Sequence, residues 1–423
     1  MCVQEVFANG PSAHVGLMPG DRIVSVDTVQ AAARKISTED LIKLMRGPRN
    51  TVVDLGIVRR GLEGVGHYKV KRGIVSVPTV PYYGMLDKEV GYIKVTSFAE
   101  NTHKEFREGI MAMQNKGMKR LIVDLRGNGG GLLDAAINIA NELLPKDDLI
   151  VYTNGAHQWR HDVKSKGGGL FTEGRLVVLI DESSASASEI VAGAMQDNDR
   201  GWIMGRRSFG KGLVQGQYSL SDGSALWLTT ARYYTPSGRC IQRPYNHGFG
   251  EYYRSNVMQA LAESFSDTID ANLMEDTTKY YTKNGRVVYG GGGIVPDKLL
   301  PYKRYDDIMY YNRLLDSMVV FDYSFEYVTN HATELMNKYK SAEDFVNRFQ
   351  VSDKMLNEML AMGEAKGLKR DEKTIAHFNP LMRSVIKASI GQSLWGSKAY
   401  YKVILTEDDE LKAAWTESKK NRK

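Results

Sequence analysis

Residues 176–197 read LVVLIDESSASASEIVAGAMQD, an apolar run followed by a turn of small residues and a second apolar pattern. The run LVVLI is rich in β-branched residues, which is typical of a buried parallel strand. After the turn, Ile190 and Ala194 are four residues apart, as are Val191 and Met195, which indicates one face of a helix. The stretch therefore predicts a strand, a turn crowded with serines, and a helix.

The same order occurs earlier in the chain. VGYIKV (90–95) precedes an amphipathic stretch near 102–115, and LIVDL (121–125) runs into the glycine loop RGNGGG (126–131) and a helix with an apolar face over 132–144. Strands that alternate with helices indicate βα crossovers and a parallel sheet. Further on, SLSDGSALWLTTARYYT (219–235) predicts a hairpin around Asp222-Gly223. We therefore expect an α/β domain with added β-hairpin structure.

The first 75 residues have a different pattern, in which short β-like runs alternate with turns. They include a helix pattern that begins at Ser37 or Thr38. GPSAHVGLMPGDRIVSVD (10–27) resembles part of a PDZ domain, a module that binds peptide C-termini by strand addition and captures the carboxylate in a glycine-containing loop. That loop would precede residue 1, so we expect an incomplete PDZ domain in a truncated chain. The alternatives are a PDZ domain that binds poorly and a small β-domain without a ligand.

Beyond about residue 304 the sequence is mostly helical, with candidate capping boxes at Ser341/Asp344 and Thr406/Asp409. No residues there suggest chemistry, so packing or self-association is the expected role. The predicted organisation is a partial PDZ domain (1–75), an α/β core (76–303) with a candidate insertion at 244–289, and a mainly helical C-terminal region (304–423).

Composition excludes some classes of protein. The net charge of +6 is small for 423 residues, and only the tail KKNRK concentrates it, so nucleic acid is not an expected partner. Two cysteines are too few for a disulfide framework or a cysteine metal site. No apolar run approaches the roughly 18 residues of a membrane helix, and no signal segment is visible, though a missing N-terminus would hide one.

A serine in the turn 183–188 is a candidate nucleophile, and a serine hydroxyl needs a base. None of the eight histidines lies in a triad-like motif, and His157 and His161 lack the glutamate of an H-E-x-x-H zinc site. Lysine can replace histidine in Ser-Lys enzymes. The candidate is Lys211 in SFGKGLVQ (208–215), where flanking glycines allow close backbone approach. From this segment alone, an exposed lysine in a glycine turn is the simpler interpretation.

Four motifs in order make the argument more specific. LIVDLRGNGGGLLDAA (121–136), the segment 177–215, ARYYTPSGRCIQ (231–242) and GGIVPD (292–297) are similar to the motifs of the C-terminal processing peptidases, the tail-specific serine proteases. With the PDZ-like segment, the resemblance covers roughly residues 3–300. It implies a ClpP/crotonase-like peptidase core with a PDZ domain that recognises or gates substrates.

The resemblance also implies roles for individual residues. The family's nucleophile and its base, 25 residues later, correspond to Ser186 and Lys211, and Gln215 corresponds to a glutamine that orients the lysine. The backbone N–H of Ala187 and that of Gly130 or Gly131 would form the oxyanion hole. Glu189 matches a glutamate of the family. Because it lies in the first turn of the helix, its negative charge would interact favourably with the helix dipole. Residues four apart in a straight strand are about 13 Å apart, so the Gly-Lys-Gly segment must bend for Gln215 to reach Lys211.

For function, the resemblance implies cleavage of unstructured proteins near apolar C-termini through an acyl-enzyme, with no metal or other cofactor. It also implies a periplasmic or otherwise exported location and self-association into a homo-oligomer. Two other classes stay open. The loop RGNGGG could cradle phosphate, although it lacks the spacing of known nucleotide-binding motifs. The stronger alternative is a catalytically silent scaffold that binds peptides and keeps the peptidase fold.

Overall fold

The fold is known from a computed structural model, and the chain forms two compact units. One consists of Met1–Val77 and Tyr305–Asp408, and the other of Pro78–Arg304 and Asp409–Lys423. The structure describes residues 1–420 except 4–5, 8–9, 32–35, 60–62, 246–247, 249, 251–253, 255–257, 259–264, 267, 269–276 and 303–307. One difference from the sequence-based division is that the last segment groups with the core. The predicted limits 1–75, 76–303 and 304–423 stay a prediction.

The N-terminal part is a small β-domain with an antiparallel sheet in the order β2-β1-β3-β4. The elements are α1 (Pro11–His14), β1 (Arg22–Val26), β2 (Val29–Gln30), α2 (Thr38–Met45), β3 (Val52–Val58) and β4 (Gly66–Lys71). Helix α2 begins at Thr38, as the sequence predicts, and Ser37 caps it, because its side chain accepts a hydrogen bond from the Asp40 N–H. A core of apolar side chains that includes Leu41, Val53 and Ile57 lies between α2 and the sheet.

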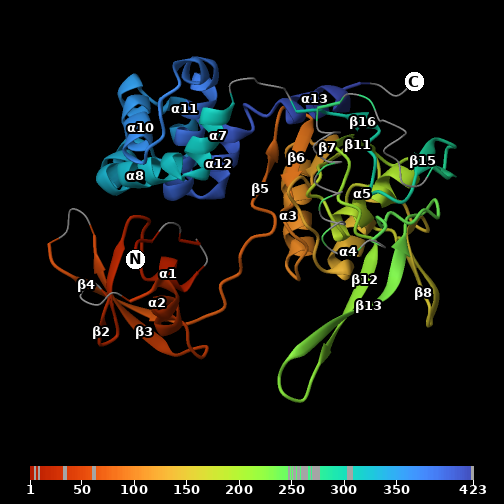
Figure 1. The fold of residues 1–423 in the computed structure, drawn as a ribbon, viewed down its shortest axis with the longest axis horizontal. Coiled ribbons are helices and arrows are strands. Elements are labelled where there is room, and N and C mark those ends of the chain that lie inside the picture. The colour runs from red at the N-terminus through yellow and green to blue at the C-terminus, as the bar shows by residue number, and fades with distance from the viewer. Residues whose placement is uncertain are drawn as a thin grey trace. The chain divides into compact units, whose positions relative to one another are not determined.

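The core unit is built on a six-stranded sheet in the order β16-β11-β10-β7-β6-β5 (Figure 1). All neighbouring strands are parallel except β5, which is antiparallel to β6. Its elements are β5 (Tyr82–Met85), β6 (Val90–Lys94), α3 (Thr102–Gln114), β7 (Arg120–Asp124), α4 (Leu133–Leu143), β10 (Arg175–Ile180), α5 (Ala187–Asp197), β11 (Trp202–Gly205) and β16 (Lys298–Leu299). The predicted α/β core is confirmed.

Both faces of this sheet are buried. Alternate residues such as Val123 and Val178 join one apolar core with α3, α4 and α5. The residues between them, such as Ile122 and Val177, are also fully buried, and α13 (Asp409–Ser418) packs against β7 and β10. A parallel sheet needs cover on both faces because its strands are apolar throughout. The last helix of the chain therefore supplies cover that the crossover helices leave open.

A second sheet of the same unit carries the predicted hairpin. Its order is β12-β13-β8-β9, formed by β8 (Leu149–Gly155), β9 (Gln158–Lys164), β12 (Leu213–Ser219) and β13 (Ala225–Tyr234). In Figure 1 the β12–β13 hairpin projects away from the rest of its unit. The candidate insertion 244–289 lies largely outside the described residues. Its end forms a small hairpin of β14 (Lys279–Tyr281) and β15 (Val287–Tyr289).

The C-terminal region is helical, as predicted, and has its own aromatic-rich core. Its helices are α7 (Met309–Asp316), α8 (Val319–Lys338), α9 (Ala342–Arg348), α10 (Asp353–Ala365), α11 (Glu372–Trp395) and α12 (Ser397–Ile404). Ser341 caps α9 through the Asp344 N–H, as predicted. The box predicted at Thr406 is wrong, because Thr406 Oγ1 donates to the Val403 carbonyl and the next helix begins only at Asp409. Among the described residues, no helix is apolar for long enough to cross a membrane.

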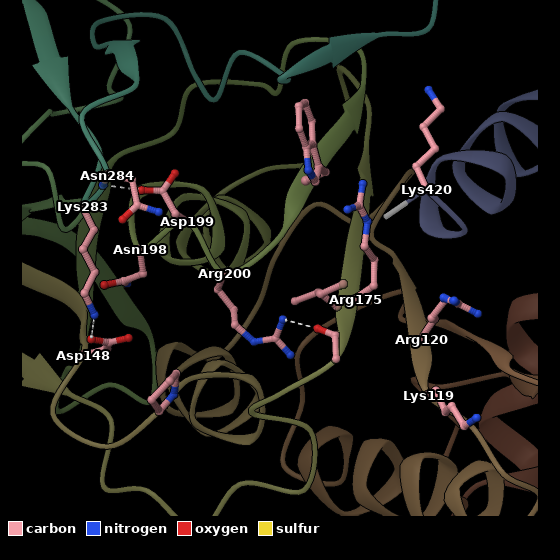
Figure 2. A pocket seen from close by; sticks show the side chains of 14 residues that line it. Lys119, Arg120, Asp148, Arg175, Asn198, Asp199, Arg200, Lys283, Asn284 and Lys420 are labelled. Atoms are coloured by element: carbon pink, nitrogen blue, oxygen red, sulfur yellow. Dashed lines mark hydrogen bonds and ion pairs between the residues drawn. The ribbon is translucent and has the colours of Figure 1, made fainter. Parts of the chain in front are cut away.

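The two edges of the core sheet border different cavities. The carboxyl ends of β7 and β10 lead into the glycine loop and the serine turn, and the cavity there is lined by Ser186. The amino ends of β7, β10 and β11 border a second cavity, lined by Arg120, Arg175 and Trp202 (Figure 2). In open α/β sheets the carboxyl edge is the usual place of the active site.

Candidate active site

The serine turn joins β10 to α5, and only one of its serines combines partial exposure with a place at the cavity. Ser184 donates from Oγ to the Leu125 carbonyl at 2.9 Å, and Ser188 donates from Oγ to the Asn128 carbonyl at 2.8 Å. Both are buried and hold the glycine loop, whereas Ser183 is exposed. Ser186 is half-buried and lines a cavity of about 540 Å³. The structure therefore separates Ser186 from the serines that have a packing role.

Ser186 also has an unusual backbone conformation, with φ 55° and ψ −110°. A non-glycine residue in such a sparsely populated region costs about 1–3 kcal/mol, and the surrounding contacts must hold it there. Strain of this kind is common where a nucleophile is placed on a sharp turn between a strand and a helix. Ser186 is the one residue of the turn with a positive φ.

Lys211 and Gln215 line the same cavity as Ser186. Lys211 lies in an irregular segment before β12, between Gly210 with φ +91° and Gly212, which packs against the Gln242 backbone. The pairing of β12 with β13 shifts register between Val214 and Gln215. The chain is therefore irregular between Lys211 and Gln215. The predicted catalytic residues come together from two separate segments.

The glycine loop approaches the serine turn closely. A Cβ on Gly130 would lie 2.9 Å from the Ser186 Cβ and 3.1 Å from the Ala187 backbone N. The Gly130 N–H donates to Asn128 Oδ1 at 2.9 Å, so it serves the loop itself. Gly131 lines the cavity together with Ala187. Of the two glycines that the sequence proposes for the oxyanion hole, Gly131 has the better position.

The close approach of Gly130 leads to a prediction about stability. Gly130→Ala would place its methyl group 2.7 Å from the Ala185 carbonyl oxygen, at a residue whose φ is +101°. We expect the free energy of unfolding to fall by about 2 kcal/mol and cleavage to fall about 100-fold, because the nucleophile is displaced. Urea unfolding and a peptide cleavage assay measure both effects.

Gly129→Ala is the matched control, because nothing lies within 4 Å of the position that its methyl group would take and its φ is not positive. Its free energy of unfolding should stay within about 0.5 kcal/mol of wild type. Equal destabilisation by the two substitutions would contradict the close contact between the glycine loop and Ser186.

Glu189 connects the serine turn to the lysine segment. Its buried carboxylate accepts hydrogen bonds from the backbone N–H groups of Ser186 (2.8 Å), Gly210 (2.7 Å) and Lys211 (2.9 Å), and from Ser208 Oγ (2.6 Å). Burial raises the pKa of Glu189 to about 7, although these four donors oppose the shift by favouring the ionised form. The carboxylate thus connects the two segments of the candidate site by hydrogen bonds.

Tyr233 on β13 makes a second connection between the same segments. Its hydroxyl donates to the Ser186 carbonyl at 3.1 Å and also contacts the Lys211 carbonyl. The sequence gives no local signal for this role beyond the motif ARYYT. The sequence also assigns Glu189 only a helix-dipole effect, because its partners Ser208 to Lys211 lie about twenty residues away.

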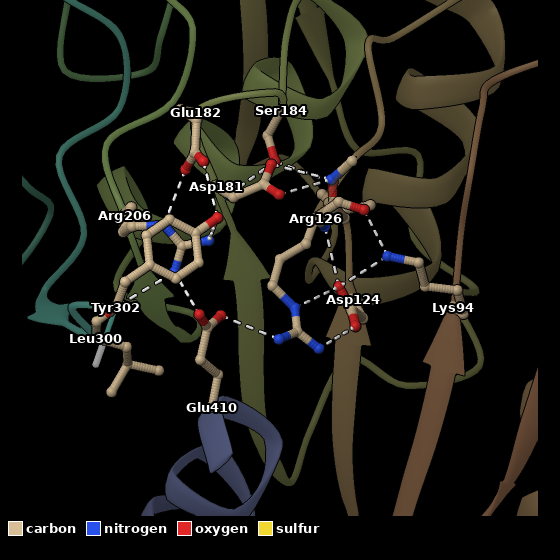
Figure 3. Close-up of polar contacts among 12 residues, drawn as sticks. Lys94, Asp124, Arg126, Asp181, Glu182, Ser184, Arg206, Leu300, Tyr302 and Glu410 are labelled. Atoms are coloured by element: carbon tan, nitrogen blue, oxygen red, sulfur yellow. Dashed lines mark hydrogen bonds and ion pairs between the residues drawn. The ribbon is translucent and has the colours of Figure 1, made fainter. Parts of the chain in front are cut away.

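A cluster of charged residues anchors the start of the glycine loop (Figure 3). Asp124 is buried and accepts hydrogen bonds from Tyr92 Oη at 2.7 Å, from Lys94 Nζ at 3.1 Å and from the Arg126 guanidinium. Burial alone would raise the pKa of Asp124, but Arg126 and Lys94 hold it well below its usual range. The carboxylate is therefore ionised, and it fixes the direction in which the chain leaves β7.

Helix α13 joins this cluster through Glu410. One carboxylate oxygen accepts from Arg126 Nη1 at 3.0 Å and the other contacts Arg206 Nη1. Arg206 also pairs at 2.8 Å with Glu182, which directly precedes the serine turn. Glu410 thus bridges two arginines. Arg126 lies in the glycine loop, and Arg206 follows β11 and pairs with Glu182 next to the serine turn.

This bridge predicts that α13 stabilises the core unit. Glu410 is 17% exposed, and its removal leaves two arginines without that carboxylate. We expect Glu410→Ala to lower the free energy of unfolding by about 2–3 kcal/mol. Lys412→Ala is the control on the same helix, because Lys412 is 50% exposed and pairs with Asp409 only at 3.4 Å. If urea unfolding gives the same value for both variants, the bridge contributes nothing measurable.

Candidate metal ligands do not cluster. Within the described part of the chain, no group of three or more His, Cys, Asp or Glu side chains could hold a metal ion. His157 lies in the turn before the exposed strand β9, and His161 lies in the middle of that strand.

Comparison with known proteins defines the class of this chain. Residues 89–248 match peptidase family S41, residues 3–59 match the PDZ domain, and residues 310–396 match a family of unknown function. The matched PDZ and peptidase segments coincide with the β-domain and the α/β core described above. The class is therefore a PDZ domain followed by an S41 peptidase core.

Curated relatives give the family. The carboxy-terminal-processing protease of Bartonella bacilliformis is 38% identical over 290 residues, which cover 67% of this chain and 64% of that protein. The carboxyl-terminal-processing protease of Synechocystis sp. is 36% identical over 242 residues, 56% of this chain and 55% of that protein. This chain belongs to the carboxyl-terminal processing peptidases. It spans between about half and two thirds of the length of these two relatives.

A solved structure described as a photosystem II D1 C-terminal processing protease is also similar. It is 26% identical and matches 71% of this chain and 68% of its own, with a TM-score of 0.38.

Proposed function

We propose that this protein is a serine endopeptidase that acts through a Ser-Lys dyad. The observation that carries the proposal is that Ser186, Lys211 and Gln215, from two separate segments, line one cavity at the carboxyl edge of the sheet. Family membership supports the same assignment. The alternative, a silent scaffold, is less favoured because the three residues that match the family's catalytic motif are all present.

In this mechanism Lys211 is the general base and then the general acid. Its neutral amine takes the proton from Ser186 Oγ as the oxygen bonds to the carbonyl carbon of the peptide. The resulting oxyanion accepts hydrogen bonds from the N–H groups of Ala187 and Gly131, of which each donor contributes about 3 kcal/mol. The lysine ammonium then gives its proton to the leaving amine. When this amine departs, the acyl group stays bound to Ser186 as an ester. Water, deprotonated by Lys211, hydrolyses this ester and restores Ser186.

Gln215 and Glu189 have supporting roles in this proposal. The side-chain oxygen of Gln215 would accept a hydrogen bond from the Lys211 amine and so direct its lone pair towards Ser186. Glu189 would be a positioning residue, because it holds the backbone of Ser186 and that of Lys211 rather than the reacting atoms. Together these two residues would hold the base and the nucleophile in a fixed position relative to each other.

The cavity also suggests the substrate. Apolar side chains line most of it, among them Leu132, Ile190, Leu213 and Trp227. We infer that it accepts an apolar side chain next to the cut bond, as in unstructured proteins with apolar C-termini. The PDZ domain would supply recognition of the peptide C-terminus. A location outside the cytoplasm and self-association are parts of this proposal that rest on the family resemblance alone.

A matched pair of substrates tests this preference. One is an unfolded protein that ends in three apolar residues, and the other ends in three aspartates. We expect kcat/KM to be at least about 10-fold higher for the first, because burial of a carboxylate in an apolar cavity is costly. Fragments are identified by mass, with Ser186→Ala as the blank. Equal cleavage of both substrates would contradict the assigned preference, and binding of both without cleavage would favour the scaffold.

A further inference from the structure

The second cavity of the core unit lies at the sheet edge opposite Ser186. Its volume is about 580 Å³, and it is lined by residues at the starts of β7, β10 and β11, after α5, in the turn between β14 and β15, and at Lys420. Strand β10 begins at Arg175 in this cavity and ends at Ile180, before the serine turn. Six strand residues span roughly 17 Å, so this cavity is separate from the peptidase cavity.

Basic side chains dominate its lining. Six basic and two acidic residues border it, and Figure 2 shows most of them around the cavity: Lys119, Arg120, Arg175, Arg200, Lys283 and Lys420, with Asp148 and Asp199. Two carboxylates outside the lining partly neutralise this positive charge. Glu89 pairs with Lys119 and Arg120, and Glu417 pairs with Arg175 and Lys420. Counted together these residues hold six positive and four negative charges, so a surplus of positive charge remains.

Arg200 gives the cavity a fixed cation. Its guanidinium donates to the backbone carbonyls of Leu143, Phe171, Glu173 and Gly174 at distances between 2.7 and 3.1 Å. These four carbonyls fix the orientation of the guanidinium but carry no net charge. A cation that is already held in place loses little conformational entropy when an anion binds.

Trp202 is the aromatic residue of the lining. It lines the same cavity, and its indole N–H is buried without an acceptor among the described residues. A buried donor of this kind costs about 1–3 kcal/mol unless something accepts its hydrogen bond.

We propose that this cavity binds a small phosphate-bearing anion. Arginine presents several N–H donors in a fixed fork that suits phosphate oxygens, and Arg120 and Arg175 line the cavity. Arg200 contributes its charge, because backbone carbonyls already accept four of its five N–H groups. A phosphate also has more acceptor oxygens and more charge than a single carboxylate, which fits the surplus of positive charge. The volume is within the range of small-molecule sites. The same chemistry is offered by a free polyphosphate and by a phospholipid headgroup.

The test uses inorganic pyrophosphate and the whole chain in isothermal titration calorimetry, at constant ionic strength. The variant Lys119→Glu/Lys420→Glu reverses two lining charges whose side chains are 71% and 58% exposed, so folding should be unaffected. The control Lys104→Glu/Lys354→Glu makes the same change in net charge at exposed helical pairs elsewhere. We expect saturable binding by wild type, a Kd at least tenfold higher for the cavity variant, and less than a twofold change for the control.

A second arm distinguishes the two sources of phosphate. Vesicles of phosphatidylcholine with and without phosphatidate are sedimented with each protein. If wild type sediments with phosphatidate vesicles and the cavity variant does not, the result supports a lipid headgroup as ligand. If wild type binds pyrophosphate but does not sediment with the vesicles, the result supports a free anion. The proposal is overturned if pyrophosphate does not bind saturably, or if the control loses affinity as the cavity variant does.

Discussion

Ser186→Ala and Lys211→Arg are each expected to lower the rate of peptide cleavage by at least about 10⁴-fold. Loss of the Ser186 hydroxyl removes the nucleophile. Arginine keeps the positive charge of Lys211, but it cannot give up a proton in a protein and so cannot act as a base. The rate is measured on an unfolded protein with apolar terminal residues, and melting temperatures show that the variants are folded.

Two controls make this result specific. Ser183→Ala changes an exposed serine of the same turn and should cleave within about twofold of wild type. Lys211→Ala should be as inactive as Lys211→Arg. If Lys211→Arg kept most of the activity, Lys211 would act as a cation and not as a base, and the proposed dyad would be wrong.

Glu189→Gln is expected to lower the free energy of unfolding by about 2–5 kcal/mol and to reduce kcat strongly. The carboxylate accepts from four donors, but a glutamine amide has one oxygen and one NH₂ group in its place. Its NH₂ group must face at least one of these donors, and each buried donor left unsatisfied costs about 1–3 kcal/mol. Because the donors include the N–H groups of Ser186 and Lys211, the geometry of the site changes with them.

Glu173→Gln is the matched control, because Glu173 is an exposed carboxylate of the same unit. Urea unfolding gives the free energies, and kcat and KM are measured for each variant. A role in positioning predicts that kcat falls while KM changes little. If Glu189→Gln unfolds like wild type and the control, the carboxylate does not connect the two segments.

Much of the core could be predicted from the sequence because its signals are local. The β-branched runs before the glycine loop and before the serine turn correspond to β7 and β10, and the apolar faces at 132–144 and 187–197 to α4 and α5. Each element and its neighbours in the chain form one βα unit. The family resemblance predicts Ser186 and Lys211, and the structure adds that both line one cavity.

The contacts that support the site could not be predicted in this way. Glu410 and Arg126 are separated by 284 residues, and nothing in the sequence around α13 indicates that it packs on the core sheet instead of the helical region. Tyr233 reaches Ser186 across 47 residues, and Glu189 reaches Gly210 across 21. These partners meet only after the sheet has formed, so local periodicity carries no information about them.

The proposed nucleophile is tested most directly by a fluorophosphonate probe, with the labelled residue located by tandem mass spectrometry. Activated serines react with this probe, because attack on phosphorus needs the same base as attack on a carbonyl. The account predicts one labelled residue, Ser186, and no label in the Lys211→Arg variant. Label on another serine, or equal labelling of Ser186 in wild type and Lys211→Arg, would contradict it.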